Sequence, residues 1–224
     1  NTFGLGRYDV TADQTGAEIF VPHVDGSKMT LRFEENFGSQ DIFGIYSKQT
    51  GMQIEIFSGA ATTGPLFPTA TDLTFVGPHV QRLSTDPVYG VPSTMDYLNF
   101  GSSFGFYFTD TSVGANGRTV YSESSKNDNV FGTGAQDEDF FLAFRGDGDT
   151  MLDNLGTART FGTSDWIIAG DIATHGDDGT GVQLKDFDDY VVFVSQMEVP
   201  APATLALLGL GLLGMGAAAR RKQA

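Results

Sequence analysis

Six aspartates in the last quarter of the chain have the type and spacing that bind a hard cation. They are Asp171, Asp177, Asp178, Asp186, Asp188 and Asp189. Ca²⁺ takes about six to eight oxygen ligands, which closely spaced carboxylates and loop carbonyls can supply. The pattern predicts a metal site at these residues, with Ca²⁺ as the candidate cofactor. The alternative, which the sequence leaves open, is a solvated turn whose charges blunt the edge of a strand.

Other residue types that carry chemistry are sparse. Asp147 and Asp149 flank Gly148 and invite the same metal interpretation, but they do not reproduce the EF-hand pattern. The three histidines are scattered along the chain, without the paired spacing of a zinc site. The chain also has no Gly-x-Ser-x-Gly elbow and no P-loop. We therefore expect a protein that is not an enzyme.

The charge and cysteine content restrict the class of protein further. The 224 residues include no cysteine, which excludes disulfides and thiolate metal sites. All 28 acidic residues and ten of the 13 basic ones precede residue 199, so this part carries a formal charge of −18. Such a field repels nucleic acid, which we exclude as a partner.

Short runs rich in Phe, Tyr, Ile and Val recur along the first 198 residues and predict strands. These runs are Ala17–Val24, Met29–Glu35, Ile42–Tyr46, Met52–Ser58, Phe104–Thr109, Asp139–Arg145, Trp166–Ala169 and Tyr190–Gln196. The predicted fold is all-β: a two-sheet antiparallel sandwich, jelly-roll-like, followed by one C-terminal apolar helix. Ala60–Pro78, with its three prolines, is expected to form a long surface loop. Trp166 and the aromatic run Phe104–Phe108 are expected in the core.

The last 26 residues differ sharply from the rest, so we divide the chain into an acidic β-sandwich body, 1–198, and a C-terminal signal, 199–224. The signal opens with Val199, Pro200, Ala201 and Pro202. An apolar segment, Ala203–Ala219, follows and would span ~26 Å as a helix. Arg220, Arg221 and Lys222 then form a basic cluster that would stop transfer on the cytoplasmic side of a membrane.

The order of these parts resembles the C-terminal sorting signal called PEP-CTERM, with Ala201 where the common form has Glu. The resemblance implies an exosortase-type sorting enzyme as partner and a Gram-negative bacterium as source. It also implies transient anchoring in the inner membrane and delivery to the cell surface or extracellular matrix. Because the chain opens with Asn1, we expect that a secretory signal peptide has been removed.

The second half of the body resembles an acidic β domain of unknown function that often precedes such signals. Four segments carry the resemblance: Tyr121–Ser125, Phe140–Phe144, Trp166–Asp171 and Asp186–Val192. The hallmark of that domain is an Asp-x-Asp-aromatic-Asn-Asp loop, usually taken to bind calcium. This chain keeps Asp186, Phe187 and Asp189 but has Leu184 where the first Asp stands and Asp188 where Asn is usual.

Three functions remain compatible with the sequence. The first is a non-catalytic structural or adhesive protein of the cell surface or extracellular matrix. The second is a subunit that assembles into homo-oligomers or filaments through β edges or its apolar tail. The third is a calcium-assisted glycan-binding module with an extracellular polysaccharide as partner. The sequence also leaves open whether the tail is cleaved or retained in an assembly.

Overall fold

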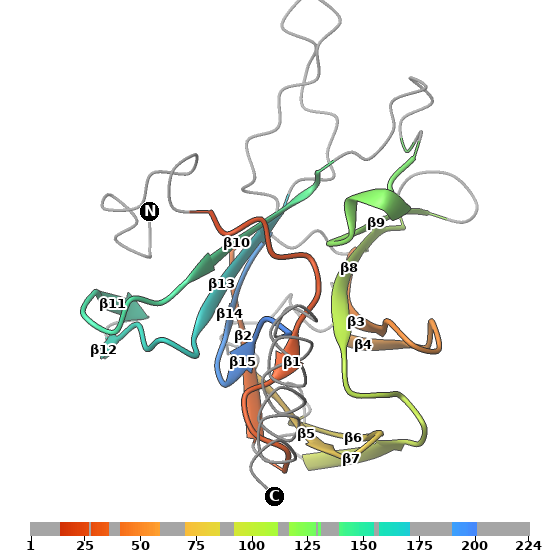
Figure 1. The fold of residues 1–224 in the computed structure, drawn as a ribbon, viewed down its shortest axis with the longest axis horizontal. Coiled ribbons are helices and arrows are strands. Elements are labelled where there is room, and N and C mark those ends of the chain that lie inside the picture. Colours follow the sequence, from red (N-terminus) through yellow and green to blue (C-terminus); the bar gives the residue numbers. More distant parts are fainter. Residues whose placement is uncertain are drawn as a thin grey trace, which may run out of the picture.

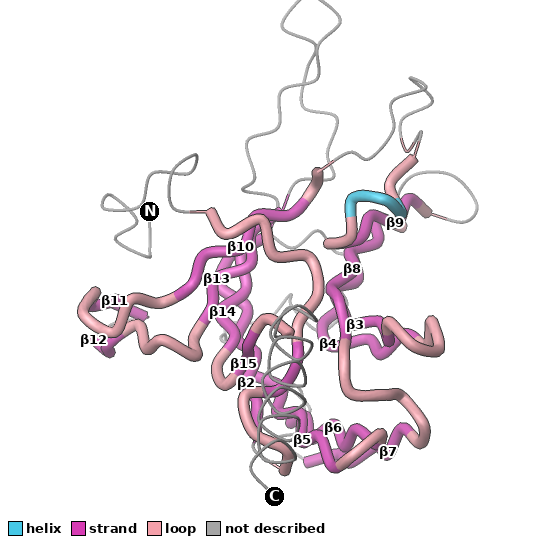
Figure 2. Tube along the Cα trace, viewed as in Figure 1, coloured by secondary structure: helices cyan, strands magenta, loops and turns pink. Residues whose placement is uncertain are grey.

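The computed structural model describes residues 14–26, 28–35, 41–58, 70–85, 92–111, 117–128, 130, 139–154, 157–170 and 190–200. This part of the chain is built almost entirely of antiparallel strands, with one short 3₁₀ turn, η3 (Ser124–Lys126) (Figure 2). Within these ranges no helix has the length and apolar character needed to cross a membrane. The predicted C-terminal helix, Ala203–Ala219, lies outside the described residues.

Two sheets form the body (Figure 1). The larger contains, in spatial order, β10 (Phe141–Arg145), β13 (Trp166–Gly170), β14 (Tyr190–Val194), β2 (Lys28–Glu35), β5 (Ala70–Val76), β6 (His79–Thr85) and β7 (Pro92–Tyr97). The smaller contains β4 (Gln53–Ser58), β3 (Asp41–Ser47), β8 (Phe104–Asp110) and β9 (Arg118–Tyr121). Strands far apart in sequence pair at β14–β2 and β3–β8, as a jelly-roll-like path requires.

Two small sheets complete the fold. β1 (Val21–Pro22) pairs with β15 (Met197–Glu198), and β11 (Met151–Asn154) forms a hairpin with β12 (Thr157–Thr160). The larger sheet bends so that β5, β6 and β7 lie below β3 and β4 in Figure 1. There the guanidinium of Arg82 on β6 donates a hydrogen bond of 3.2 Å to the carbonyl of Ile56. This bond provides a partner for one backbone carbonyl on β4, which is an edge strand of the smaller sheet.

The core lies between the two sheets and is dominated by aromatic side chains. Alternation explains how it forms: Leu73 and Phe75 point inward from β5, and Phe104, Phe106 and Phe108 from β8. Trp166, fully buried on β13, packs edge-on against Phe20 with 5.3 Å between ring centroids. The predicted antiparallel sandwich, with Trp166 and the aromatic run in its core, is confirmed.

Two tyrosines on the outer face of the smaller sheet lie over glycines of the neighbouring strand. Tyr46 on β3 pairs with Gly105 on β8, and Gly44 on β3 pairs with Tyr107 on β8. A Cβ added at Gly105 would lie 2.5 Å from the Tyr46 ring, and one at Gly44 would lie 2.5 Å from the Tyr107 ring. Each glycine therefore leaves the space that a tyrosine ring fills, and the reciprocal pairs fix the register of β3 on β8.

The prediction of a long loop over Ala60–Pro78 is wrong for its second part, because residues 70–76 form β5, an inner strand of the larger sheet between β2 and β6. The prolines of this region lie outside that strand, at 65, 68 and 78. The strand itself alternates buried Thr71, Leu73 and Phe75 with more exposed neighbours. Its polar inward Thr71 weakened the period-two pattern that would have identified it.

We expect Gly105→Ala to lower the free energy of unfolding by about 1–3 kcal/mol, because the new methyl group collides with the buried Tyr46 ring. Urea unfolding checks this. The control is Tyr46→Ala: in that background Gly105→Ala should cost less than in the wild type. The collision has to exceed the roughly 0.5–1 kcal/mol by which alanine is intrinsically better than glycine in a strand, so a variant as stable as the wild type would contradict the expected net loss.

Candidate functional site

All six predicted calcium ligands fall in the single connection between β13 and β14. That connection, residues 171–189, lies outside the described residues. Its two ends are adjacent, because Gly170 at the end of β13 pairs directly with Tyr190 at the start of β14. Within the described ranges, no group of three or more His, Asp or Glu side chains could hold a metal ion. The calcium site therefore stays a prediction.

Asp147, the other acidic residue considered as a metal ligand, caps its own turn. Its Oδ1 accepts hydrogen bonds from the backbone N–H groups of Asp149 at 2.8 Å and Thr150 at 2.7 Å. Its Oδ2 accepts one from the Thr150 hydroxyl at 2.6 Å. These bonds, the hydroxyl first, lower the pKa of Asp147 to about 2. Both oxygens are thus engaged in holding the loop between β10 and β11.

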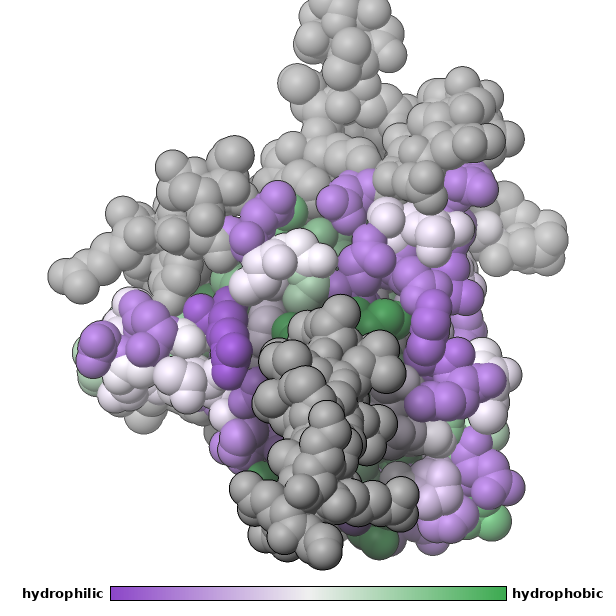
Figure 3. Space-filling model, in the orientation of Figure 1, coloured by the Kyte–Doolittle hydropathy of each residue, from purple (hydrophilic) through white to green (hydrophobic). Residues whose placement is uncertain are grey.

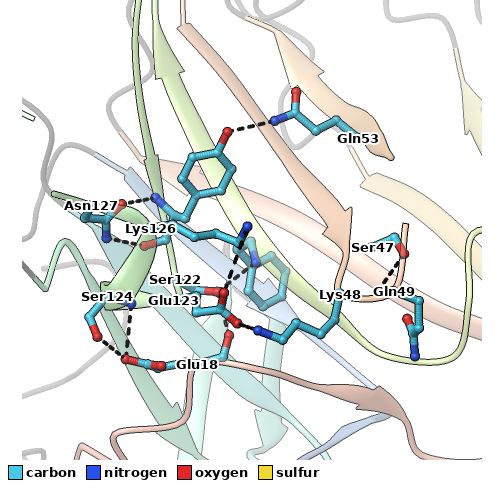
Figure 4. Close-up of polar contacts among 12 residues, drawn as sticks. Glu18, Ser47, Lys48, Gln49, Gln53, Ser122, Glu123, Ser124, Lys126 and Asn127 are labelled. Atoms are coloured by element: carbon cyan, nitrogen blue, oxygen red, sulfur yellow. Dashed lines mark hydrogen bonds and ion pairs between the residues drawn. The ribbon is translucent and has the colours of Figure 1, made fainter. Parts of the chain in front are cut away.

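A buried carboxylate, Glu123, organises a polar cluster beside η3 (Figure 4). Its side chain is only 8 % exposed and forms ion pairs with Lys48 and, at 4.0 Å, with Lys126. The Lys126 ammonium also lies 5.3 Å from the centroid of the Tyr46 ring and 5.5 Å from that of Tyr121. Burial, and then the charge of Glu123, raise the pKa of Tyr46 above its ordinary range.

The remaining bonds of this cluster join it to distant parts of the chain. The Ser122 hydroxyl accepts the N–H of Phe106 at 2.9 Å and donates to the carbonyl of Glu18 at 2.6 Å. The Glu18 carboxylate accepts a bond of 2.6 Å from the Ser124 hydroxyl. Asn127 bonds both backbone groups of Tyr121, at 2.8 and 2.7 Å (Figure 4). We interpret the cluster as a structural tie that fixes the end of β9.

A groove of about 490 Å³ opens between loops at one end of the sandwich. Residues from the end of β1, the β3–β4 turn, the β5–β6 turn and the loop before β8 line it. Two of its polar side chains are already bonded within the body: Asp25 accepts the N–H of Gly77 at 2.8 Å, and Gln49 donates to Ser103 at 2.8 Å. The groove therefore offers few free polar groups to orient a ligand.

The last described strand, β15, is held to the body on both sides of its backbone. Val21 and Pro22 of β1 pair with it, and the N–H of His23 donates to the carbonyl of Gln196 at 2.9 Å. On the other side the N–H of Met197 donates to the carbonyl of Ser164 at 2.9 Å. The indole N–H of the buried Trp166 donates to the carbonyl of Met197 at 2.8 Å.

The side chain of Glu198, at the end of β15, is held by three residues from separate segments. Arg145 approaches Oε2 with its Nη2 at 2.9 Å, and His23 approaches Oε1 with its Nδ1 at 3.0 Å. The Ser164 hydroxyl donates to Oε1 at 3.3 Å. Arg145 is itself oriented by a bond of 2.7 Å to the carbonyl of Thr163 and by the Trp166 ring, 5.9 Å from its guanidinium.

Although Ser164, His23 and Glu198 are in contact, they do not form a catalytic triad. A triad histidine uses one ring nitrogen for the hydroxyl and the other for the carboxylate. Here Nδ1 of His23 faces both the Ser164 hydroxyl, at 3.2 Å, and the Glu198 carboxylate, at 3.0 Å. The arrangement instead supports a charge-assisted anchor for Glu198.

Sequence reasoning missed this anchor, because its members lie far apart in the chain and belong to no motif. Only the first residues of the predicted sorting signal belong to the part of the chain that the structure describes. Val199 and Pro200 directly follow β15 and are described. Ala201, Pro202 and the basic cluster Arg220, Arg221 and Lys222 lie outside the described residues.

The depressed pKa of Asp147 gives a titration test. Thr150→Val removes the hydroxyl that contributes most to the shift and should move the pKa of Asp147 from about 2 toward its ordinary value. A carboxyl-detected NMR titration measures this, with the exposed Thr94→Val as control. Because the folded-state pKa lies below the unfolded one, the stabilisation is complete above the unfolded value and disappears as the pH falls toward 2. An unshifted titration in Thr150→Val would contradict the capping geometry.

Comparison with known proteins finds one match. Residues 198–222 match the family model of the PEP-CTERM protein-sorting motif. No curated protein matches the chain, and no solved structure does. The matched motif begins at Glu198, which is the residue that the body anchors. The chain therefore carries a PEP-CTERM sorting signal, which indicates a bacterial protein that is exported, processed by an exosortase and associated with the cell surface.

Proposed function

We propose that the chain is a non-catalytic structural or adhesive protein of the surface or extracellular matrix of a Gram-negative bacterium. The observation that carries the proposal is the direct junction between the sandwich and the sorting motif: β15 ends at Glu198, and the motif starts there. The body thus constitutes the cargo that the signal delivers. In this proposal the apolar segment and basic cluster anchor the chain in the inner membrane until an exosortase acts.

The surface and interior of the body support a cargo role. On the face that Figure 3 shows, hydrophilic residues are more widespread than hydrophobic ones among the described residues. The high net negative charge keeps such a protein soluble outside the cell. Stability without disulfides then depends on the aromatic core, and the polar clusters around Glu123 and Glu198 are bonded within the body. These features are typical of a stable structural domain rather than of an enzyme.

The sorting step has a direct test in cells with and without an exosortase. We expect the surface form from exosortase-positive cells to lack Arg220-Arg221-Lys222, because the signal is removed when the body is delivered. Without the exosortase, the chain should keep these residues and remain in the membrane fraction. Mass spectrometry of the surface-extracted protein identifies the terminal residue in each case. An intact basic terminus on the surface form would refute the proposed processing.

Calcium is proposed as a stabilising ligand of the acidic residues 171–189, which connect β13 to β14. Because a ligand that binds only the folded protein stabilises it by mass action, Ca²⁺ at 100 times its Kd would add about 2.7 kcal/mol. We expect a higher Tm with Ca²⁺ than with chelator. A variant with Asp186, Asp188 and Asp189 changed to Asn should lose the difference, whereas Asp72→Asn on β5 should keep it. Identical melting curves with Ca²⁺ and chelator would exclude a specific site.

A further inference from the structure

The first residue of the sorting motif is also the last residue of a strand, so the motif begins inside the folded body. Glu198 belongs to β15 and to the matched segment 198–222. The side chain one residue earlier, Met197, is fully buried, whereas Val199 is 42 % exposed. The chain therefore changes from core to surface over two residues, and the sandwich determines where it leaves.

We propose that the Glu198 clamp, formed by Glu198, His23, Ser164 and Arg145, positions the sorting motif for the enzyme that reads it. This inference rests on the proposed sorting function and adds to it a role for residues of the body. His23, Ser164 and Arg145 are positioning residues: they act through Glu198 and belong to three segments remote from the motif in sequence.

The clamp fixes both the place and the direction of the chain. Backbone bonds from His23 and Ser164 hold the two flanks of β15, and the Trp166 indole bonds its middle. The three side-chain contacts at 2.9 to 3.3 Å then prevent the Glu198 end of the strand from fraying. A strand of two residues has few bonds of its own, so these additional contacts determine whether its end stays in place.

The residues that follow Glu198 also restrict the direction in which the chain leaves the body. Val199 precedes a proline and is therefore restricted to extended conformations. Pro200 has a fixed φ angle, so the two described residues that follow Glu198, Val199 and Pro200, form a stiff start to the motif. A stiff segment that starts from an anchored residue points in a restricted range of directions. The same segment on a loose end would sample many more.

An anchored, extended segment suits an enzyme that must bind the chain next to a folded domain. Binding a loose segment requires the backbone to be ordered at that moment, and pre-organisation removes this cost. Ordering the backbone of one residue corresponds to about a five- to thirtyfold factor in an equilibrium constant. Releasing the clamp should therefore slow processing by about fivefold or more.

The main test uses the full-length chain in exosortase-positive cells and follows the loss of Arg220-Arg221-Lys222 over time by mass spectrometry. His23→Ala/Arg145→Ala breaks the clamp without changing the motif, and we expect processing about fivefold slower. His23→Gln/Arg145→Lys keeps a donor at both positions and should restore most of the rate. That rescue distinguishes positioning from a general effect of mutating this surface.

The matched control breaks a comparable anchor elsewhere. Asp72 on β5 is 23 % exposed, close to the 25 % of Glu198, and binds Lys28 at 3.0 Å and Thr30 at 2.7 Å. Lys28→Ala removes the ion-pair partner of Asp72 and leaves Thr30, whose backbone bonds Ser195, unchanged, so it should not alter the processing rate. Thermal unfolding of each purified variant reports any loss of overall stability, which the control variant should share.

A second variant leaves the body untouched. A flexible Gly/Ser spacer followed by a second Glu, inserted between Glu198 and Val199, separates the clamp from an uninterrupted copy of the motif, so it should slow processing by a similar factor. In the spacer background, breaking the clamp should have no further effect. This outcome does not depend on whether the His23→Ala/Arg145→Ala variant folds well.

The possible results distinguish failure of the sorting function from failure of the positioning role. A wild-type chain that keeps its basic terminus in exosortase-positive cells overturns the sorting function, and the positioning role with it. A processed wild type with equally fast clamp and spacer variants overturns only the positioning role. If Glu198→Ala slows processing but His23→Ala/Arg145→Ala does not, the enzyme reads Glu198 directly, and the clamp has no part in sorting.

Discussion

The ring of Tyr190 stacks on that of Phe108 with 4.4 Å between centroids and a 12° angle, and so joins the larger sheet to the smaller one. Phe43 on β3 contacts the same tyrosine at 5.6 Å. In a chain without cysteine, aromatic contacts of this kind are what hold the two sheets face to face. Each buried ring also removes a large apolar area from water, the dominant favourable contribution to folding.

The same core reaches the sorting motif through a short series of contacts. Phe20 packs on Trp166 at 5.3 Å, and the Trp166 indole donates to the carbonyl of Met197. The guanidinium of Arg145 lies over the Trp166 ring and forms an ion pair with Glu198. The stability of the core and the position of the motif are therefore coupled. A body that loses its aromatic packing also loses the anchor from which its delivery signal extends.

The sequence predicted the architecture well because the physical signals are local. Alternating residues such as those of Met52–Ser58 and the apolar run of β14 identify strands without knowledge of their partners. Among the strands that it missed, β6 and β7 are near-edge and edge strands with exposed Leu83 and Met95. The inner strand β5 was missed because it follows a proline-rich segment and places the polar Thr71 inward. The pairing of strands was not predictable, because β14–β2 and β3–β8 depend on contacts between distant segments.

The candidate site also has a part that the sequence predicted and a part that it did not. The sorting motif is a continuous segment, so its order and composition were sufficient to identify it. The Glu198 clamp was not predictable, because it forms only when residues near positions 23, 145 and 164 meet in the fold. The acidic residues 171–189, which connect β13 to β14, lie outside the described residues, and the calcium site there stays a prediction.

The sorting motif starts from an ordered strand of the body. Hydrogen exchange of the Met197 amide in the intact chain tests this most directly, because that amide donates to Ser164 at the boundary between core and motif. We predict exchange nearly as slow as that of the amides in β13 and β14. Exchange of Met197 at the rate of an unstructured chain, while those strands stay protected, would contradict the claim.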